Sequence, residues 1–290
     1  MKTKKVYLIL LILLFAKTLT YAQPDQFYHE FSYLFNDTVP LIFQQNSFQI
    51  SDSTYLSTGN YGMFFGLAGR VIWDSSGNVL DARYLDLDIS FLPTGLTRID
   101  SNRFLLYGKF KLYHETTGAY IDDAAALVCF NQAAEVLWYK TYGGYAPGYP
   151  DIEAPTYEYL DFFCGVEIDS INERIYAYGE SCSFNAEHED KPYVVCTDYV
   201  GDTIWTWTMP DLPNLKNGSI KGATLTEGGD LLLVGNTGRH EGDTEKTFNK
   251  GLVIKLSANG EMLWYKLWGD SYPDTFEVLE LPDESFVLGG

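Results

Sequence analysis

Two short patterns recur along the chain and constrain the fold more than any other feature of the sequence. The first is a turn between two apolar strands, as in "LSANGEMLW", with a small residue in the turn. These turn residues are 57, 67 and 59 residues apart, at Gly77, Ala134, Gly201 and Gly260. The second is a strand that ends in glycine. These glycines are 49, 71, 56 and 54 residues apart, at Gly59, Gly108, Gly179, Gly235 and Gly289. Such a recurrence is typical of solenoids and propellers.

Each repeat consists of four short strands. In the last copy, a hairpin joins "GLVIKLS" to "EMLWYKLWG", and a strand at 276–281 turns through "PDES" into a strand at 286–288. Aromatic residues make up 16% of the chain, and runs such as "RFLLYGKF" favour strands, whereas helical periodicity is nearly absent. Four strands in roughly 40 to 60 residues is the size of a propeller blade. We therefore expect an all-β fold, a β-propeller of four-stranded antiparallel blades, with about four full blades and partial blades at both ends.

Apolar side chains occupy both faces of the hairpin strand "EMLWYKLW". Simple alternation places Met262, Trp264 and Trp268 on one face, and Leu263, Tyr265 and Leu267 on the other. A sheet that is apolar on both faces is expected to lie between two neighbouring sheets. We therefore expect the tryptophans that share one repeat position to pack between blades, namely Trp138, Trp205 and Trp264.

The N-terminal segment differs from the repeats. Lys2, Lys4 and Lys5 precede an apolar run at 6–16, and Thr20, Tyr21 and Ala22 precede a plausible cleavage point. This pattern is typical of a secretory signal peptide at 1–22, with an uncleaved anchor as the alternative. We expect residues 23–290 to form the propeller domain, secreted or at the cell surface, with no membrane insertion after cleavage.

The chain is strongly acidic, with a formal net charge of −19. Removal of residues 1–22 takes four lysines and no acidic residue, which leaves a charge of −23. Such a surface repels phosphate groups, so nucleic acid and anionic membrane surfaces are not expected partners. The excess of carboxylates either attracts divalent cations or serves solubility.

The chain has four cysteines, at Cys129, Cys164, Cys182 and Cys196. An even number in an exported chain permits disulfides. Cys129 and Cys196 share one repeat position, which favours packing. Buried thiols and a single bridge both remain open, and Cys182 with Cys196 is the preferred pair because the two lie close in sequence.

The units "GLVIKLSANGEMLWYKLWG" and "TFEVLELPDESFVLGG" resemble the repeats of secreted β-propeller proteins of Bacteroidetes, which the type IX secretion system often exports. The resemblance covers most of 44–290 and is weakest in the first unit, where Asp81 replaces the tryptophan. It implies an exported propeller with a sorting domain or further repeats beyond those present. Either the sequence is a fragment, or the N-terminal "QFYHEFSYLF" joins the C-terminal strands to close the ring.

The predicted loops divide unevenly between the two sides of the ring. One side has tight turns such as "SSGN" and "PDES". The other carries the long connections, at 109–123, 141–157, 181–191, 209–218, 235–250 and 269–274. Long loops on a rigid scaffold commonly bind ligands. Aromatic and acidic residues suited to a glycan or protein partner gather there. They are Tyr145, Tyr149, Asp151, Tyr157, Trp268, Asp270 and Tyr272.

A histidine followed by glutamate occurs in three of these loops, at His114, His188 and His240. Imidazole and carboxylate suit zinc, but loops on neighbouring blades diverge, and solvated acidic loops are the alternative. We expect no cofactor, with a divalent cation as the open exception. A metal-stabilised scaffold is therefore a third hypothesis for the role of the chain.

Known catalytic motifs are missing from the sequence. It has no phosphate-binding glycine loop, no "HExxH", no "GxSxG" and no EF-hand pattern. Our main hypothesis is an exported, non-enzymatic propeller that binds a glycan, a protein or a cell-surface partner through its long-loop face. The alternative is a secreted hydrolase or lyase that acts on polysaccharide, because 39 acidic residues leave many carboxylate pairs open.

Overall fold

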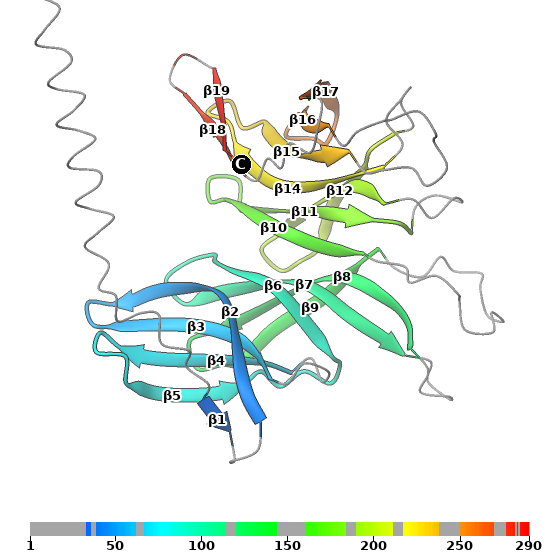
Figure 1. Cartoon of the computed structure of the whole chain (residues 1–290). Helices are drawn as coiled ribbons and strands as arrows, with labels where there is room; N and C mark the ends of the chain where they lie inside the picture. Colours follow the sequence, from blue (N-terminus) through cyan, green and yellow to red (C-terminus); the bar gives the residue numbers. More distant parts are fainter. Residues whose placement is uncertain are drawn as a thin grey trace, which may run out of the picture.

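A computed structural model describes most of the chain between residues 33 and 289. The described ranges are 33–35, 39–61, 67–113, 120–143, 161–183, 190–210, 217–237, 250–269, 277–281, 283 and 285–289. All regular secondary structure within them is antiparallel β-sheet (Figure 1). No helix in these ranges is long and apolar enough to span a membrane. The predicted signal peptide at 1–22 lies outside the described residues and stays a prediction.

The strands form five sheets, each from consecutive strands. The first sheet contains β1 (Tyr33–Phe35), β2 (Val39–Ser51), β3 (Thr54–Tyr61), β4 (Leu67–Asp74) and β5 (Val79–Tyr84). The second contains β6 (Phe91–Arg98), β7 (Arg103–Tyr113), β8 (Tyr120–Asn131) and β9 (Val136–Tyr142). The third contains β10 (Phe162–Asp169), β11 (Arg174–Ser181), β12 (Lys191–Asp198) and β13 (Thr203–Thr208). The fourth contains β14 (Gly218–Leu225), β15 (Leu231–Thr237), β16 (Gly251–Leu256) and β17 (Met262–Trp268), and the fifth contains β18 (Glu277–Glu280) and β19 (Phe286–Gly289).

The sheets follow one another in chain order, as blades do around a propeller axis (Figure 1). The strands β2, β6, β10, β14 and β18, which we call the inner strands, contact one another from each sheet to the next. An apolar core fills each of the four interfaces between consecutive sheets. The predicted fold, an all-β propeller of four-stranded antiparallel blades, is confirmed.

The strand glycines allow a close approach between the first two strands of a blade. A Cβ on Gly108, Gly179 or Gly235 would lie 2.2, 2.1 or 1.9 Å from a carbonyl oxygen of the inner strand. Each inner strand bulges at this point, which moves its backbone toward the glycine. The periodic glycines of the sequence therefore mark the bulges of the inner strands.

The turn residues predicted from the sequence have left-handed backbone conformations. The φ angle is 83° at Gly77, 65° at Ala134, 80° at Gly201 and 82° at Gly260. Glycine adopts this conformation without strain, which explains why it prevails at the position.

The tryptophans pack between blades, as expected, and Trp138 and Trp205 each lie against the turn of the next blade. The indole Nε1 of Trp138 donates to the carbonyl of Tyr199 at 3.1 Å, and that of Trp205 donates to Ala258 at 3.1 Å. A Cβ on Gly201 would lie 2.8 Å from the Trp138 ring. The Trp205 ring is equally close to Gly260. Tryptophan and turn glycine therefore form one interlocking pair at each of these interfaces.

The first interface departs from this rule at both positions. Asp81 stands in place of the tryptophan, and Ala134 stands in place of the turn glycine. Asp81 instead accepts a hydrogen bond from the fully buried Arg70, with Nη2 to Oδ2 at 2.8 Å. Arg83 donates to the carbonyl of Ala133, in the turn of the second blade, at 3.5 Å. Without an indole to accommodate, this turn tolerates a methyl group.

Simple alternation along the outer strands is wrong, because each outer hairpin contains a bulge. In the fourth sheet, Lys255 pairs with Trp264 and Leu256 with Met262, so Leu263 is the extra residue. Met262 therefore packs with Tyr265 and Leu267 rather than with Trp264. The extra residues are 46–56% exposed, and they are Leu80, Leu137, Ile204 and Leu263. The expectation of burial on both faces holds for the middle strands, such as β12 and β15, but not for the outer ones.

Three further expectations bear on chain organisation. The predicted loop at 109–123 is wrong, because β7 continues to Tyr113 and Lys111 still pairs with Asp123 of β8. All four cysteines are free thiols, so Cys182 and Cys196 form no bridge. The N-terminal strand β1 pairs with β2 in the first sheet, while β18 and β19 form a separate sheet. Ring closure through the two ends stays a prediction.

Candidate functional site

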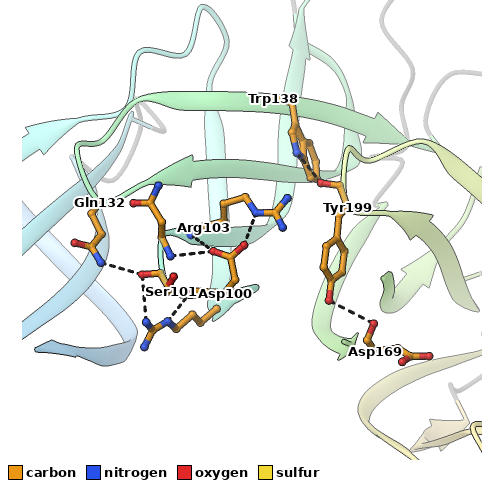
Figure 2. Close-up of polar contacts among 9 residues, drawn as sticks. Asp100, Ser101, Arg103, Gln132, Trp138, Asp169 and Tyr199 are labelled. Atoms are coloured by element: carbon orange, nitrogen blue, oxygen red, sulfur yellow. Dashed lines mark hydrogen bonds and ion pairs between the residues drawn. The ribbon is translucent and has the colours of Figure 1, made fainter. Parts of the chain in front are cut away.

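The tight-turn side of the propeller is occupied by polar contacts within the second blade and between it and the third blade. Figure 2 shows Asp100 bound to Arg103 and Gln132 bound to Ser101, next to the bond from Trp138 to Tyr199. The guanidinium of Arg103 lies 5.2 Å from the ring centroid of Tyr199. These polar groups satisfy one another across the turns, so their role is structural.

The long-loop side contains the residues predicted to bind a ligand, and most lie outside the described residues. This applies to the aromatic and acidic candidates Tyr145, Tyr149, Asp151, Tyr157, Asp270 and Tyr272, and to the histidines His114, His188 and His240. Trp268 is described and is 40% exposed. It ends the outermost strand β17, with its indole against Gly251. Three inter-strand spacings, roughly 14 Å in all, separate it from the inner strand of its sheet.

A cluster of charged residues surrounds Phe162 where β10 begins on the long-loop side. The ammonium groups of Lys109 and Lys221 each lie 5.8 Å from the centroid of the Phe162 ring. Lys109 belongs to the second sheet and Lys221 to the fourth, so three blades meet at this ring. We call this group the axial cluster. Its members are Lys109, Asp123, Asp161, Phe162, Cys164, Glu180, Asp190 and Lys221.

Two carboxylates of the axial cluster have structural partners. Asp123 is buried and forms an ion pair with Lys109. Asp161 is fully buried and accepts hydrogen bonds from the Cys182 N–H at 3.1 Å and the Ser183 hydroxyl at 2.6 Å. A buried carboxyl group with such partners has its polar atoms satisfied and fixes the surrounding backbone.

The other two carboxylates occupy positions that form an ion pair in the preceding blade. Gly108 and Gly179 occupy equivalent positions, because each pairs with the residue before an inner-strand bulge. Lys109 and Glu180, which follow these glycines, are therefore equivalent as well. Lys109 pairs with Ala125 and Glu180 pairs with Pro192. Asp123 and Asp190 each stand two residues before these partners. The third blade therefore places two carboxyl groups, of Glu180 and Asp190, where the second places an ammonium and a carboxylate.

This exchange of a cation for a carboxylate affects the titration of Asp190. Asp190 is exposed at the surface, yet partial desolvation raises its pKa, the carboxylates of Glu180 and Asp161 raise it further, and Lys221 opposes the shift. Glu180 has a cation beside it, with Lys221 Nζ 3.6 Å from its Oε2. When two neighbouring carboxyl groups have unequal environments, one can keep its proton and act as a donor while the other is charged.

A second group lies further along β10. Burial raises the pKa of Glu167 to about 7. Burial also raises the pKa of Tyr107 and Tyr178, with a contribution from the Glu167 charge. Each tyrosine ring covers a glycine of an inner strand, Gly95 for Tyr107 and Gly165 for Tyr178. The two tyrosine rings thus fill the space left by these glycines.

Metal and thiol chemistry receive no support from the described part of the chain. It contains no group of three His, Cys, Asp or Glu residues arranged to hold a metal ion. Burial raises the pKa of Cys129, Cys164 and Cys196 to about 12, so these thiols stay protonated near neutral pH.

The fold and the axial cluster define a β-propeller with a charged group where its second, third and fourth blades meet. No family model matches the sequence, and no curated protein matches it. Among solved structures, a protein of unknown function from Dyadobacter fermentans is similar with a TM-score of 0.50 and 11% identity, covering 86% of this chain and 76% of its own.

Two carbohydrate-related enzymes are also similar in fold. A mannose phosphorylase from Leishmania mexicana has a TM-score of 0.43 and 10% identity, covering 87% of this chain and 80% of its own. A β-fructofuranosidase from Bombyx mori has a TM-score of 0.37 and 13% identity, covering 82% of this chain. The chain spans about half of that enzyme, 51% of its length. At these identities the likeness concerns the fold alone.

Proposed function

We propose that the chain is a carbohydrate-acting β-propeller that hydrolyses a glycosidic bond at the axial cluster. The observation that carries the proposal is the carboxyl pair of Glu180 and Asp190, at positions where the neighbouring blade has the ion pair of Lys109 and Asp123. Like charges at one site disfavour each other. Such an arrangement is expected where it serves chemistry rather than stability.

The pair meets the requirements of glycoside hydrolysis. One carboxyl group must give a proton to the leaving oxygen, and the other must act as a base toward water or attack the sugar carbon. Overall, water supplies hydroxide to the sugar carbon and a proton to the cluster, so no other reactant is needed. Asp190, with its raised pKa, is the candidate acid, and Glu180 is the candidate base or nucleophile.

The surroundings indicate a neutral glycan as the substrate. The half-buried Phe162 supplies an apolar contact, and Lys109 and Lys221 are donors for hydroxyl groups. Both ammonium groups already have carboxylate partners, and the formal net charge of −19 disfavours acidic sugars. The carbohydrate enzymes named above share only the fold, so the proposal rests on the carboxyl pair.

The test is the release of reducing ends from a panel of neutral polysaccharides and aryl glycosides. Glu180→Gln and Asp190→Asn should each lower turnover by about 10²-fold or more, because each removes a proton-transfer group. Asp202→Asn and Glu261→Gln are matched controls in outer hairpins, and both should leave turnover unchanged. Glycan binding without turnover by the unmodified chain would instead support the non-enzymatic scaffold.

A further inference from the structure

In the second and third blades, the outer hairpin of the next blade covers two side chains: the tryptophan and the residue four positions later. Trp138 donates to the turn between β12 and β13, and the Tyr142 hydroxyl donates to the carbonyl of Gly201 in the same turn at 2.8 Å. Trp205 donates to the turn between β16 and β17. Met209, four residues later, packs in the core shared with β16 and is 1% exposed. An outer hairpin therefore buries both side chains of the blade before it.

The fourth blade has less cover at the same two positions. Trp264 is half-buried and packs on Phe286 of the fifth sheet, with ring centroids 6.4 Å apart. Trp268, four residues later, is 40% exposed. The residues at this position in the three earlier blades are only 1–6% exposed, namely Leu85, Tyr142 and Met209. Trp268 therefore occupies a position that the next blade buries elsewhere in this propeller.

The fifth sheet explains this exposure, because it contains only β18 and β19 in the described part of the chain (Figure 1). Val278 and Phe286 pack on the fourth blade, while Leu288, on the same face, is 36% exposed. In each of the first four sheets the second strand of the blade also pairs with a third. Among the described residues, β19 has no such neighbour. We call the edge of β19, together with Trp264 and Trp268, the open side of the fifth blade.

We propose that the open side of the fifth blade binds a β-hairpin of this repeat type, with a left-handed glycine in its turn. Its first strand pairs with the edge of β19, and its turn lies on Trp264 as Gly201 lies on Trp138. The two earlier interfaces identify this occupant, since a hairpin of this kind covers the equivalent side chains there. The inference is independent of the proposed hydrolysis.

The experiment measures binding of a synthetic peptide of residues 251–269 to the full chain by calorimetry, with hydrogen exchange to locate the site. The peptide carries two lysines and one glutamate, so its charge is opposite to that of the acidic chain. Amides at 286–289 should gain protection. Trp268→Ala in the chain should weaken binding by about 10-fold or more, because a large aromatic contact is lost. Leu263→Ala, at a 50% exposed bulge residue of the same strand, is the matched control and should leave binding unchanged.

A change in the peptide alone tests the same contact without altering the chain. Gly260 has a φ of 82°, which strains valine, so the Gly260→Val peptide should bind about 10-fold more weakly or worse. The inference is overturned if the peptide does not bind, or if neither Trp268→Ala nor Gly260→Val weakens binding. Amides at 286–289 that are already protected in the chain alone would also overturn it. Another part of the chain or a second copy would then occupy the edge, and light scattering tells these two apart.

Discussion

At the scale of single residues, Glu167 is the clearest case of a side chain whose surroundings disfavour its charged form. It lies on β10 and is partly buried, and its burial favours the neutral form enough to raise its pKa from 4.5 to about 7. Tyr107 and Tyr178, whose pKa values its charge raises, supply no positive charge. A charge without a cation in such a place destabilises the folded state.

The stability of the fold should therefore depend on the ionisation of Glu167. Its pKa is higher in the folded state, so its favourable contribution is present below pH 4.5 and is lost as pH rises through about 7. Glu167→Gln mimics the neutral acid. It should match the unmodified chain at pH 4 and exceed it by on the order of 2 kcal/mol at pH 8.

Urea unfolding at the two pH values measures this difference, with the exposed Glu261→Gln as control. Equal unfolding free energies for Glu167→Gln and the unmodified chain at pH 8 would show that the Glu167 charge is not destabilising.

At the scale of elements, the hairpin turn and the tryptophan of the preceding blade act together. Gly201 and Gly229 have nearly the same φ, 80° and 81°. Gly201 faces Trp138 at 2.8 Å from an added Cβ, whereas Gly229 has nothing within 4 Å. The two positions therefore separate backbone strain from the contact between blades.

Both alanine variants should lose stability, and Gly201→Ala should lose more. Backbone strain at positive φ costs about 1 kcal/mol at either site. At Gly201 the displacement of the Trp138 ring adds about 1–2 kcal/mol. Unfolding free energies from urea titration give the comparison. Equal losses at the two sites would mean that the indole moves aside freely.

The strands and turns were largely predictable from the sequence, because glycines recur at regular intervals, once at each inner-strand bulge and once at most left-handed turns. The direction of individual side chains was not. Bulges at Leu263 and its equivalents shift the alternation by one residue, and no single letter of the sequence marks them. The extended hairpin of β7 and β8 was also missed, because the pairing of Lys109 with Asp123 looks like a solvated loop until the register is known.

At the scale of the whole molecule, the site depends on relations between blades. Among 39 acidic residues, Asp190 drew attention only as a neighbour of His188, in a loop for which solvated charge was the alternative to metal binding. The signal was present in the repeats: the alignment of Gly108 with Gly179 sets Lys109 against Glu180, and the alignment of Cys129 with Cys196 sets Asp123 against Asp190. The contact of both Lys109 and Lys221 with Phe162 could not be inferred, since it joins blades two apart.

The location of the site at the axial cluster is the central claim, and ligand-dependent hydrogen exchange tests it most directly. Asp190→Asn, which should bind without turnover, is titrated with neutral oligosaccharides, and exchange is followed by peptide mass spectrometry. We predict that protection concentrates at 161–164, 179–183 and 190–193, where three blades meet. Protection confined to the tight turns at 170–173 and 257–260, or no protection with any glycan, would contradict the account.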